Sequence, residues 1–154
     1  MPVSEKISSV LKSVEKPGRY AGGEYGAVLK DKEKVKARFA FCFPDTYEIG
    51  MSNLGVRILY GVLNSDPDIW CERAYAPWVD MQAKMRELSI PLWAHESGDP
   101  LTDFDIIGFT LQYEMCYTTV LSMLKLSGIP LLAAERGEDA PVLIGGGPCA
   151  YNAE

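Results

Sequence analysis

The sequence predicts an α/β fold that is Rossmann-like (flavodoxin-like), with a mainly parallel sheet and helices on both faces, preceded by an N-terminal helix and a β-hairpin. From Ala37 onward, short apolar runs alternate with segments whose apolar residues recur at helical spacing. Strands that alternate with helices pair in parallel through right-handed crossovers. A length of 154 residues and a hydrophobic content of 47% suit one domain with its own core.

The first 36 residues have the pattern of an amphipathic helix followed by a basic hairpin. Residues 4–15 carry one apolar stripe, which includes Ile7 and Val10, and Pro17 ends the helix. After a glycine-rich turn, the runs YGAVLK and KVKARFAFCF flank the polar turn DKE, which predicts a hairpin whose second arm continues into the first core strand. The sequence is therefore divided into an arm, 1–36, and a Rossmann domain, 37–154.

Residues 37–154 are expected to alternate strands and helices. Helices are indicated where apolar residues form one stripe along a segment. Pro77 marks the start of one such helix, and Gly128 marks the end of another. The expected order is the strand ARFAFCF, the loop DTYEIGMS, a helix over about 53–64, the strand IWCERAY, a helix after Pro77, the extended piece IPLWAH, the buried central strand DIIGFTLQ, an interior helix over 113–126, a short strand PLLAAE and the strand PVLIGGG.

The sequence stops at Glu154, directly after the last strand and its glycines, where a doubly wound fold continues into a helix. We therefore expect the Rossmann domain to be truncated at its C-terminal end. The last strand should then be exposed on one face or covered by a second copy in a homodimer.

The charge pattern limits the partners. The net charge of −6 argues against non-specific nucleic-acid binding, which needs many Lys and Arg to neutralise phosphates. Residues 1–38 hold nine Lys and Arg against five Asp and Glu, so a basic arm is expected to dock on acidic surface of its own body or of a partner. No apolar run is long enough for a membrane span, and the N-terminus lacks a signal-peptide core, so we expect a cytoplasmic protein.

The four cysteines lie tens of residues apart, each in an apolar stretch, and form no metal-binding or redox motif. We expect core packing for Cys42, Cys71 and Cys116, while Cys149 beside the glycine run stays open. Neither a metal site nor a catalytic residue is predicted. The nucleotide-binding motifs are also absent, because no G-x-G-x-x-G or G-K-[ST] follows the first strand.

Ligands of open α/β sheets bind beyond the carboxyl ends of the strands, where three segments of this chain converge. The first has the form D-x-Y-x-x-G, the second is T-L-Q after the central strand, and the third is a run of three glycines after the last strand. The candidate ligand-binding residues are Asp45, Thr46, Tyr47, Glu48, Gly50, Thr110, Gln112, Gly145, Gly146 and Gly147. Turn formation and helix capping remain alternatives for Asp45 and Glu48.

These three elements resemble those of cobalamin-binding domains, which carry D-x-H-x-x-G in the first place. The resemblance implies a loop beside which the nucleotide tail descends, a hydroxyl that bonds the tail, and glycines that allow close approach. Tyr47 stands where that family has a histidine, so a corrinoid would bind here without a histidine ligand. His95 stands in an H-x-x-G sequence, but Trp93 replaces the aspartate and the segment lies in the wrong connection.

Several longer stretches, RYAGGEYG, FAFCFPDTYEIGMSNLGVRILYGVLN, CERAYAPWVDM, DIIGFTLQYE and PVLIGGGPCAYNAE, resemble the N-terminal region of an uncharacterised bacterial family of radical S-adenosylmethionine (radical SAM) proteins. The likeness extends from about Pro17 to Glu154. It implies a cobalamin-binding-like domain without the catalytic machinery. The C-x-x-x-C-x-x-C motif, the iron–sulfur cluster and S-adenosylmethionine would belong to a C-terminal radical SAM domain, which is the expected partner.

Three hypotheses about function follow. The first is a degenerate cobalamin-binding-like domain that binds a corrinoid without a histidine ligand or positions substrate over the catalytic barrel. The alternative is a structural or interaction module without ligand, docking on the catalytic domain or on a second copy. A stand-alone enzyme that uses Asp45, Glu48 and Glu114 as acid–base groups is the weakest, because the sequence offers no nucleophile or metal cluster.

Overall fold

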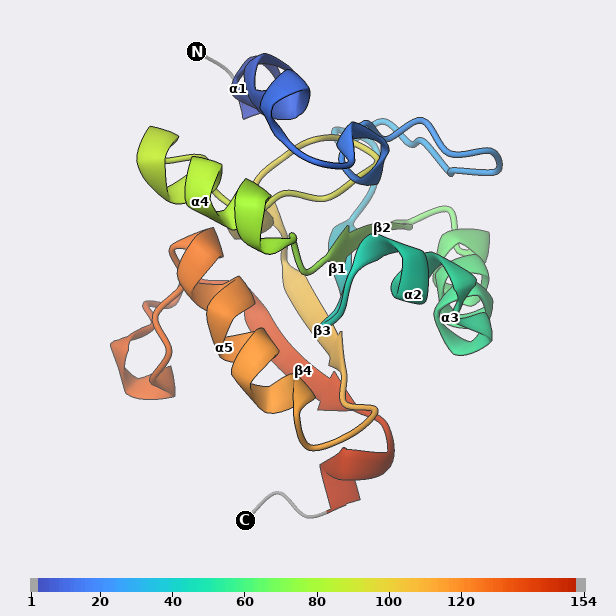
Figure 1. The fold of residues 1–154 in the computed structure, drawn as a ribbon. Coiled ribbons are helices and arrows are strands. Elements are labelled where there is room, and N and C mark those ends of the chain that lie inside the picture. The colour runs from blue at the N-terminus through green and yellow to red at the C-terminus, as the bar shows by residue number, and fades with distance from the viewer. Residues whose placement is uncertain (1–2, 152–154) are drawn as a thin grey trace.

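The computed structural model describes residues 3–151, and its centre is a four-stranded, all-parallel sheet (Figure 1). The strands are β1 (Ala37–Phe43), β2 (Ile69–Tyr75), β3 (Ile106–Thr110) and β4 (Val142–Gly146), arranged in the order β2-β1-β3-β4. The order reverses between β1 and β3, as it does in flavodoxin-like sheets. The predicted α/β class with a parallel sheet is therefore confirmed.

Helices cover both faces of the sheet. The helices are α1 (Val3–Val10), α2 (Tyr47–Ser52), α3 (Leu54–Ser65), α4 (Val79–Leu88) and α5 (Cys116–Ser127). Side chains alternate along a strand, so Ala40 and Cys42 of β1 meet α4 and α5 on one face, and Phe41 and Phe43 meet α3 on the other. Among the described residues, no helix is long and apolar enough to cross a membrane.

The helices on the two faces of the sheet do not cover the strands equally. Met81 and Met85 of α4 and Met123 of α5 are buried in the larger core cluster together with Ile107 of β3. The smaller cluster contains α3 through Val56 and Tyr60, but its strand residues come from β1 and β2 alone. The α3 side of β3 and β4 is consequently left open, and Val142 and Ile144 of β4 are exposed there, as expected for the last strand.

The N-terminal arm packs against its own body. The apolar stripe of α1, with Ile7 and Val10, is buried in the larger core cluster. The basic residues that follow pair with acidic groups of the same chain, Arg19 with Glu48 at 2.9 Å and Lys32 with Asp99 at 3.2 Å.

The predicted β-hairpin is wrong. In the described part of the chain, residues 20–36 contain turns and extended backbone but no strand. Both edges of β1 are occupied, one by β2 and the other by β3, so no hairpin arm can pair with it. The segment instead bonds side chains, because Tyr60 Oη accepts from Val28 N–H at 2.7 Å and Trp70 Nε1 donates to Val28 O at 3.0 Å.

Three smaller expectations also need correction. The loop DTYEIGMS forms the short helix α2, and PLLAAE contains a 3₁₀ turn, Ala133–Glu135, in place of a strand. The helix expected to be interior, α5, buries one side only, since Tyr117 and Leu121 are exposed. The other predicted strands and helices lie within a few residues of their expected positions.

Candidate functional site

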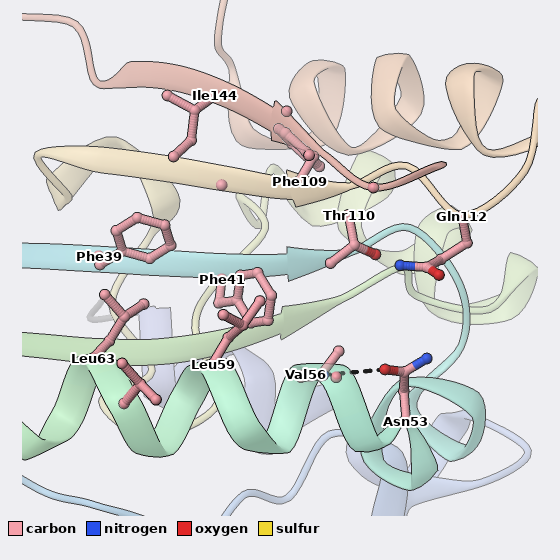
Figure 2. A pocket seen from close by; sticks show the side chains of 16 residues that line it. Phe39, Phe41, Asn53, Val56, Leu59, Leu63, Phe109, Thr110, Gln112 and Ile144 are labelled. Carbon is pink, nitrogen blue, oxygen red and sulfur yellow. Dashed lines mark hydrogen bonds between the residues drawn. The ribbon is translucent and has the colours of Figure 1, made fainter. Parts of the chain in front are cut away.

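An apolar groove lies between α3 and the strands β1, β3 and β4 (Figure 2). Its volume is about 440 Å³, within the ~300–1,000 Å³ range that is usual for small-molecule sites. The lining residues are Phe39, Phe41, Asn53, Gly55, Val56, Leu59, Val62, Leu63, Gly108, Phe109, Thr110, Gln112, Ile144, Gly145, Gly146 and Gly147. The groove runs along the sheet and reaches the carboxyl ends of β3 and β4.

Aromatic rings and a glycine make the floor of the groove. Phe39 of β1 turns its ring across Gly108 of β3, where a Cβ atom would lie 2.6 Å from Phe39 Cζ. Only a residue without a side chain therefore allows the ring to lie flat on the neighbouring strand. On the α3 side, Leu59 and Leu63 form the wall, as Figure 2 shows.

The groove is polar at one end only. Figure 2 shows Asn53, Thr110 and Gln112 together at the carboxyl edge, whereas Phe39, Leu63 and Ile144 lie toward the other end. Asn53 Oδ1 caps α3 by accepting from Val56 N–H at 3.1 Å, which fixes its amide at the groove.

Thr110 is the residue that most directly indicates a ligand. Its side chain is 7% exposed, and its Oγ1 has no hydrogen-bond partner among the described residues. A buried hydroxyl without a partner costs about 1–3 kcal/mol. A ligand atom in the groove that bonds this hydroxyl would recover that cost.

The three glycines at the end of β4 serve two purposes. At Gly145 a Cβ would lie 3.1 Å from Leu111 Cδ1, and at Gly147, whose φ is +120°, it would lie 2.7 Å from Leu111 O. These two glycines let the exits of β3 and β4 pack together, and Leu111 N–H donates to Gly146 O at 2.6 Å. Gly146 itself has open space where a Cβ would be, so its backbone borders the groove directly.

The loop after β1 lies outside the groove. Asp45 accepts hydrogen bonds from Thr46 N–H at 2.7 Å and from Tyr113 Oη at 3.2 Å. The nearby carboxylate raises the pKa of Tyr113. Thr46 is the N-cap of α2, and both Asp45 and Thr46 line a separate, shallower cavity of about 190 Å³ next to Trp78.

Tyr47, Glu48 and Gly50 also point away from the groove. The Tyr47 ring meets the Tyr75 ring edge-on at 5.4 Å and stacks on His95 at 5.7 Å between centroids, and burial raises its pKa. Glu48 pairs with Arg19, so it holds the N-terminal arm. Gly50 is needed for packing, because a Cβ there would lie 2.4 Å from the Tyr75 ring.

The candidate residues therefore separate into two groups. The structure brings together Thr110, Gln112, Gly145, Gly146 and Gly147 at the polar end of the groove, and places the five residues of the D-x-Y-x-x-G loop elsewhere. The apolar lining, with Phe39, Leu59 and Ile144, was missed because apolar residues inside strands and helices have the pattern of ordinary core. The signal that could have revealed it is α3, which carries only one charged residue.

His95, the histidine considered above as a metal ligand, lies in an environment without a set of metal ligands in the described part of the chain. His95 is buried, with Nδ1 3.6 Å from Glu24 Oε1, and its main-chain N–H donates to Arg73 O at 2.8 Å. Within residues 3–151, no group of three or more His, Cys, Asp or Glu side chains is placed to hold a metal ion. The groove itself offers a ligand apolar contact and a few hydrogen-bonding groups.

Residues 55–154, which contain α3 from its second residue onward and all later elements, match the family described as "Radical SAM proteins, N-terminal". No curated protein and no solved structure matches the chain.

Proposed function

The chain belongs to this family of radical SAM N-terminal domains, and we propose that it works there as a non-catalytic domain that holds the nucleotide tail of a corrinoid. Membership implies an accompanying catalytic domain and, in the full-length protein, an iron–sulfur cluster and S-adenosylmethionine. Within residues 3–151 the cysteines form no ligand group for a cluster, so the cluster is expected in the catalytic domain.

The unpartnered Thr110 hydroxyl at the polar end of the groove is the observation that supports the proposal. The nucleotide tail of a corrinoid ends in a flat apolar base with a ring nitrogen. Such a base would pack against Phe41 and Val56, and Thr110 would donate to its nitrogen. Gly146 would allow the ligand to approach the backbone closely.

The chain offers no nitrogen ligand to the cobalt from the loop after β1. Tyr47 occupies the place of the histidine in the resembled motif and packs against Tyr75 and His95. His95 is buried beneath the N-terminal arm and does not line the groove. A corrinoid bound here would therefore receive no cobalt ligand from Tyr47 or His95. The methyl-transfer or redox chemistry that it supplies would serve the catalytic domain.

A titration of the chain with hydroxocobalamin, followed by visible absorption, tests the proposal. We expect a spectral shift and pigment that stays with the protein after desalting. Cobinamide, which lacks the nucleotide tail, should bind at least about tenfold more weakly because the tail carries the contacts. No shift and no retained pigment would contradict corrinoid binding and leave a groove that positions substrate or contacts protein.

Two variants localise the site. Thr110→Val keeps the shape and removes the hydroxyl, so corrinoid affinity should fall about tenfold. Gly146→Leu should block the groove, since its side chain would enter open space. Thr118→Val is the matched control, because the Thr118 hydroxyl donates to Met115 O at 3.0 Å on its own helix, outside the groove.

A further inference from the structure

We infer that α3 and the open side of β4 form the docking surface for the radical SAM catalytic domain. We call this surface the α3 face and define it by Leu54, Ile58, Leu59, Val62, Val142 and Ile144. The inference rests on the proposed function in one respect, that a catalytic domain accompanies this chain. It does not depend on whether the groove binds a corrinoid.

The composition of α3 is that of a helix buried on all sides. Among its twelve residues, LGVRILYGVLNS, only Arg57 is charged, yet only Val56 and Tyr60 are buried in its own domain. Its four large apolar side chains on the α3 face are between 49% and 67% exposed. A helix that is apolar all round is normally enclosed by protein. The missing cover must therefore come from another surface.

Helix α4, on the opposite face of the sheet, is a helix of this molecule with a charged, solvent-exposed outer side. Helix α4, with the sequence VDMQAKMREL, buries Met81 and Met85 and carries four charged residues. Lys84 and Glu87 form an ion pair at 2.8 Å on its outer surface. The apolar exterior of α3 thus contrasts with the charged exterior of α4. Helix α5 lies between the two, since it carries only Lys125 as a charged residue and exposes Tyr117 and Leu121.

The edge of the sheet beside β4 continues the same surface. The outer edge of β2 is covered, since the Asn64 side chain bonds Cys71 through Nδ2 to O at 2.9 Å and through Oδ1 to N at 3.0 Å. Among the interactions of the described residues, no hydrogen bond reaches β4 from the side opposite β3. An exposed strand edge with apolar Val142 and Ile144 favours pairing with another polypeptide.

The family comparison favours the catalytic domain over a second copy. Every residue of the α3 face except Leu54 lies within the matched segment 55–154. This surface therefore belongs to the part of the chain that resembles other radical SAM N-terminal domains, and the catalytic domain is the partner that this description implies. The absence of charge from all six side chains requires an apolar patch on that partner.

Carbene footprinting read by mass spectrometry tests the inference. The side chains of the α3 face are labelled in the 154-residue chain alone and in the complete radical SAM protein. We expect labelling of Ile58, Val62 and Ile144 to fall about fivefold or more in the complete protein, as for side chains in a desolvated interface core. Labelling of Leu132, which lies outside the α3 face, should stay the same.

A matched pair of variants in the complete protein gives a second readout. Val62 is 60% exposed and Leu132 is 63% exposed, so neither substitution by lysine should damage the fold of this domain. Val62→Lys should increase the rate at which protease separates the two domains about tenfold, and Leu132→Lys should leave that rate unchanged.

Unchanged labelling of the α3 face in the complete protein would overturn the inference. So would protection that appears in the isolated chain together with a dimer mass in light scattering, because a second copy would then be the occupant. Both samples are labelled without corrinoid, because Val62 and Ile144 also line the groove and a bound corrinoid would protect them. Under that condition, failure of the titration does not change the footprint, and failure of the footprint does not change the titration.

Discussion

Glu24 carries a carboxylate from the N-terminal arm into a cluster of charged side chains beside β2. Its Oε1 lies 3.6 Å from His95 Nδ1, and its Oε2 lies 4.0 Å from an Arg73 nitrogen. Arg73 in turn pairs with Glu96 at 2.6 Å. The proximity of His95 is the main cause that lowers the pKa of Glu24 to about 2. The arm is therefore attached in part by the charge of one residue.

The Glu24→Gln variant should reveal this attachment through its pH dependence. The folded-state pKa lies below the unfolded value of 4.5, so the stabilisation is complete above pH 4.5 and is lost as the pH falls toward 2. We expect the variant to be less stable by on the order of 2 kcal/mol at pH 7 and to approach the native protein only near pH 2.

Urea unfolding at a series of pH values measures the difference. The control is Glu33→Gln, an exposed residue of the same arm, which should change stability by less than about 0.5 kcal/mol. A deficit for Glu24→Gln that is equally large at pH 3 and at pH 7 would show that its cause is packing and not charge.

Among the elements, α3 and the arm are linked by the Lys30 ammonium group in addition to the hydrogen bond between Val28 and Tyr60. Lys30 Nζ donates to Asn64 O at 3.0 Å, to Asp66 O at 2.6 Å and to Ile69 O at 2.6 Å. Those carbonyls belong to the end of α3 and the start of β2, where a cation also suits the negative end of the helix dipole. Lys30 thus holds together three segments that are separate in sequence.

Lys30→Met should destabilise the protein by about 1.5–3 kcal/mol, because three carbonyls lose a charged donor. Hydrogen exchange should accelerate over residues 24–31 before other regions respond. Lys34→Met is the matched control, since Lys34 is exposed and forms a surface ion pair with Asp31, and it should cost less than about 0.5 kcal/mol. Equal effects of the two variants would contradict a special role for Lys30.

The elements also show where sequence patterns suffice. Apolar periodicity predicted the four strands and the helices α3 and α4, because burial against a sheet dictates that pattern directly. The prediction of a hairpin was wrong because residues 24–36 contact Tyr60, Trp70 and the end of α3 instead of a second strand. Those contacts follow only from the tertiary arrangement. The helix α2 was missed because six residues are too short for a periodic signal.

The candidate site shows the same difference between positions that a local pattern predicts and positions that depend on tertiary contacts. Thr110 and Gln112 were placed correctly at the end of a central strand, where the parallel sheet fixes the edge that they occupy. The direction of Tyr47 could not be predicted, since it depends on Tyr75 and His95, which lie in other segments. The apolar lining was invisible because exposure is a property of the assembled layers and not of a residue type.

For the molecule as a whole, the reactivity of the cysteine thiols measures how well the core is protected from solvent. Cys42, Cys71 and Cys116 are buried and Cys149 is half-buried, and all four are free. Burial raises the pKa of the Cys42 and Cys71 thiols. An aromatic disulfide reagent should therefore modify only Cys149 in the native protein at pH 8, and all four thiols in denaturant.

Counting released thiolate by absorbance, with mass spectrometry to locate the modified residue, checks this expectation. Cys149→Ser should leave the native protein unreactive and supplies the control. Rapid modification of Cys42 or Cys71 without denaturant would mean that the sheet opens readily or that its core is not sealed.

The strand order has a consequence for synthesis on the ribosome. The central strand β1 pairs with β2 on one side and with β3 on the other, so that Phe39 lies opposite both Cys71 and Ile106. A nascent chain can join β1 to β2 early, but the second edge of β1 waits until β3 has been made. At about 5–20 residues per second, the wait lasts several seconds. During that interval the growing polypeptide exposes an unpaired, aromatic-rich edge to chaperones and to neighbouring nascent chains.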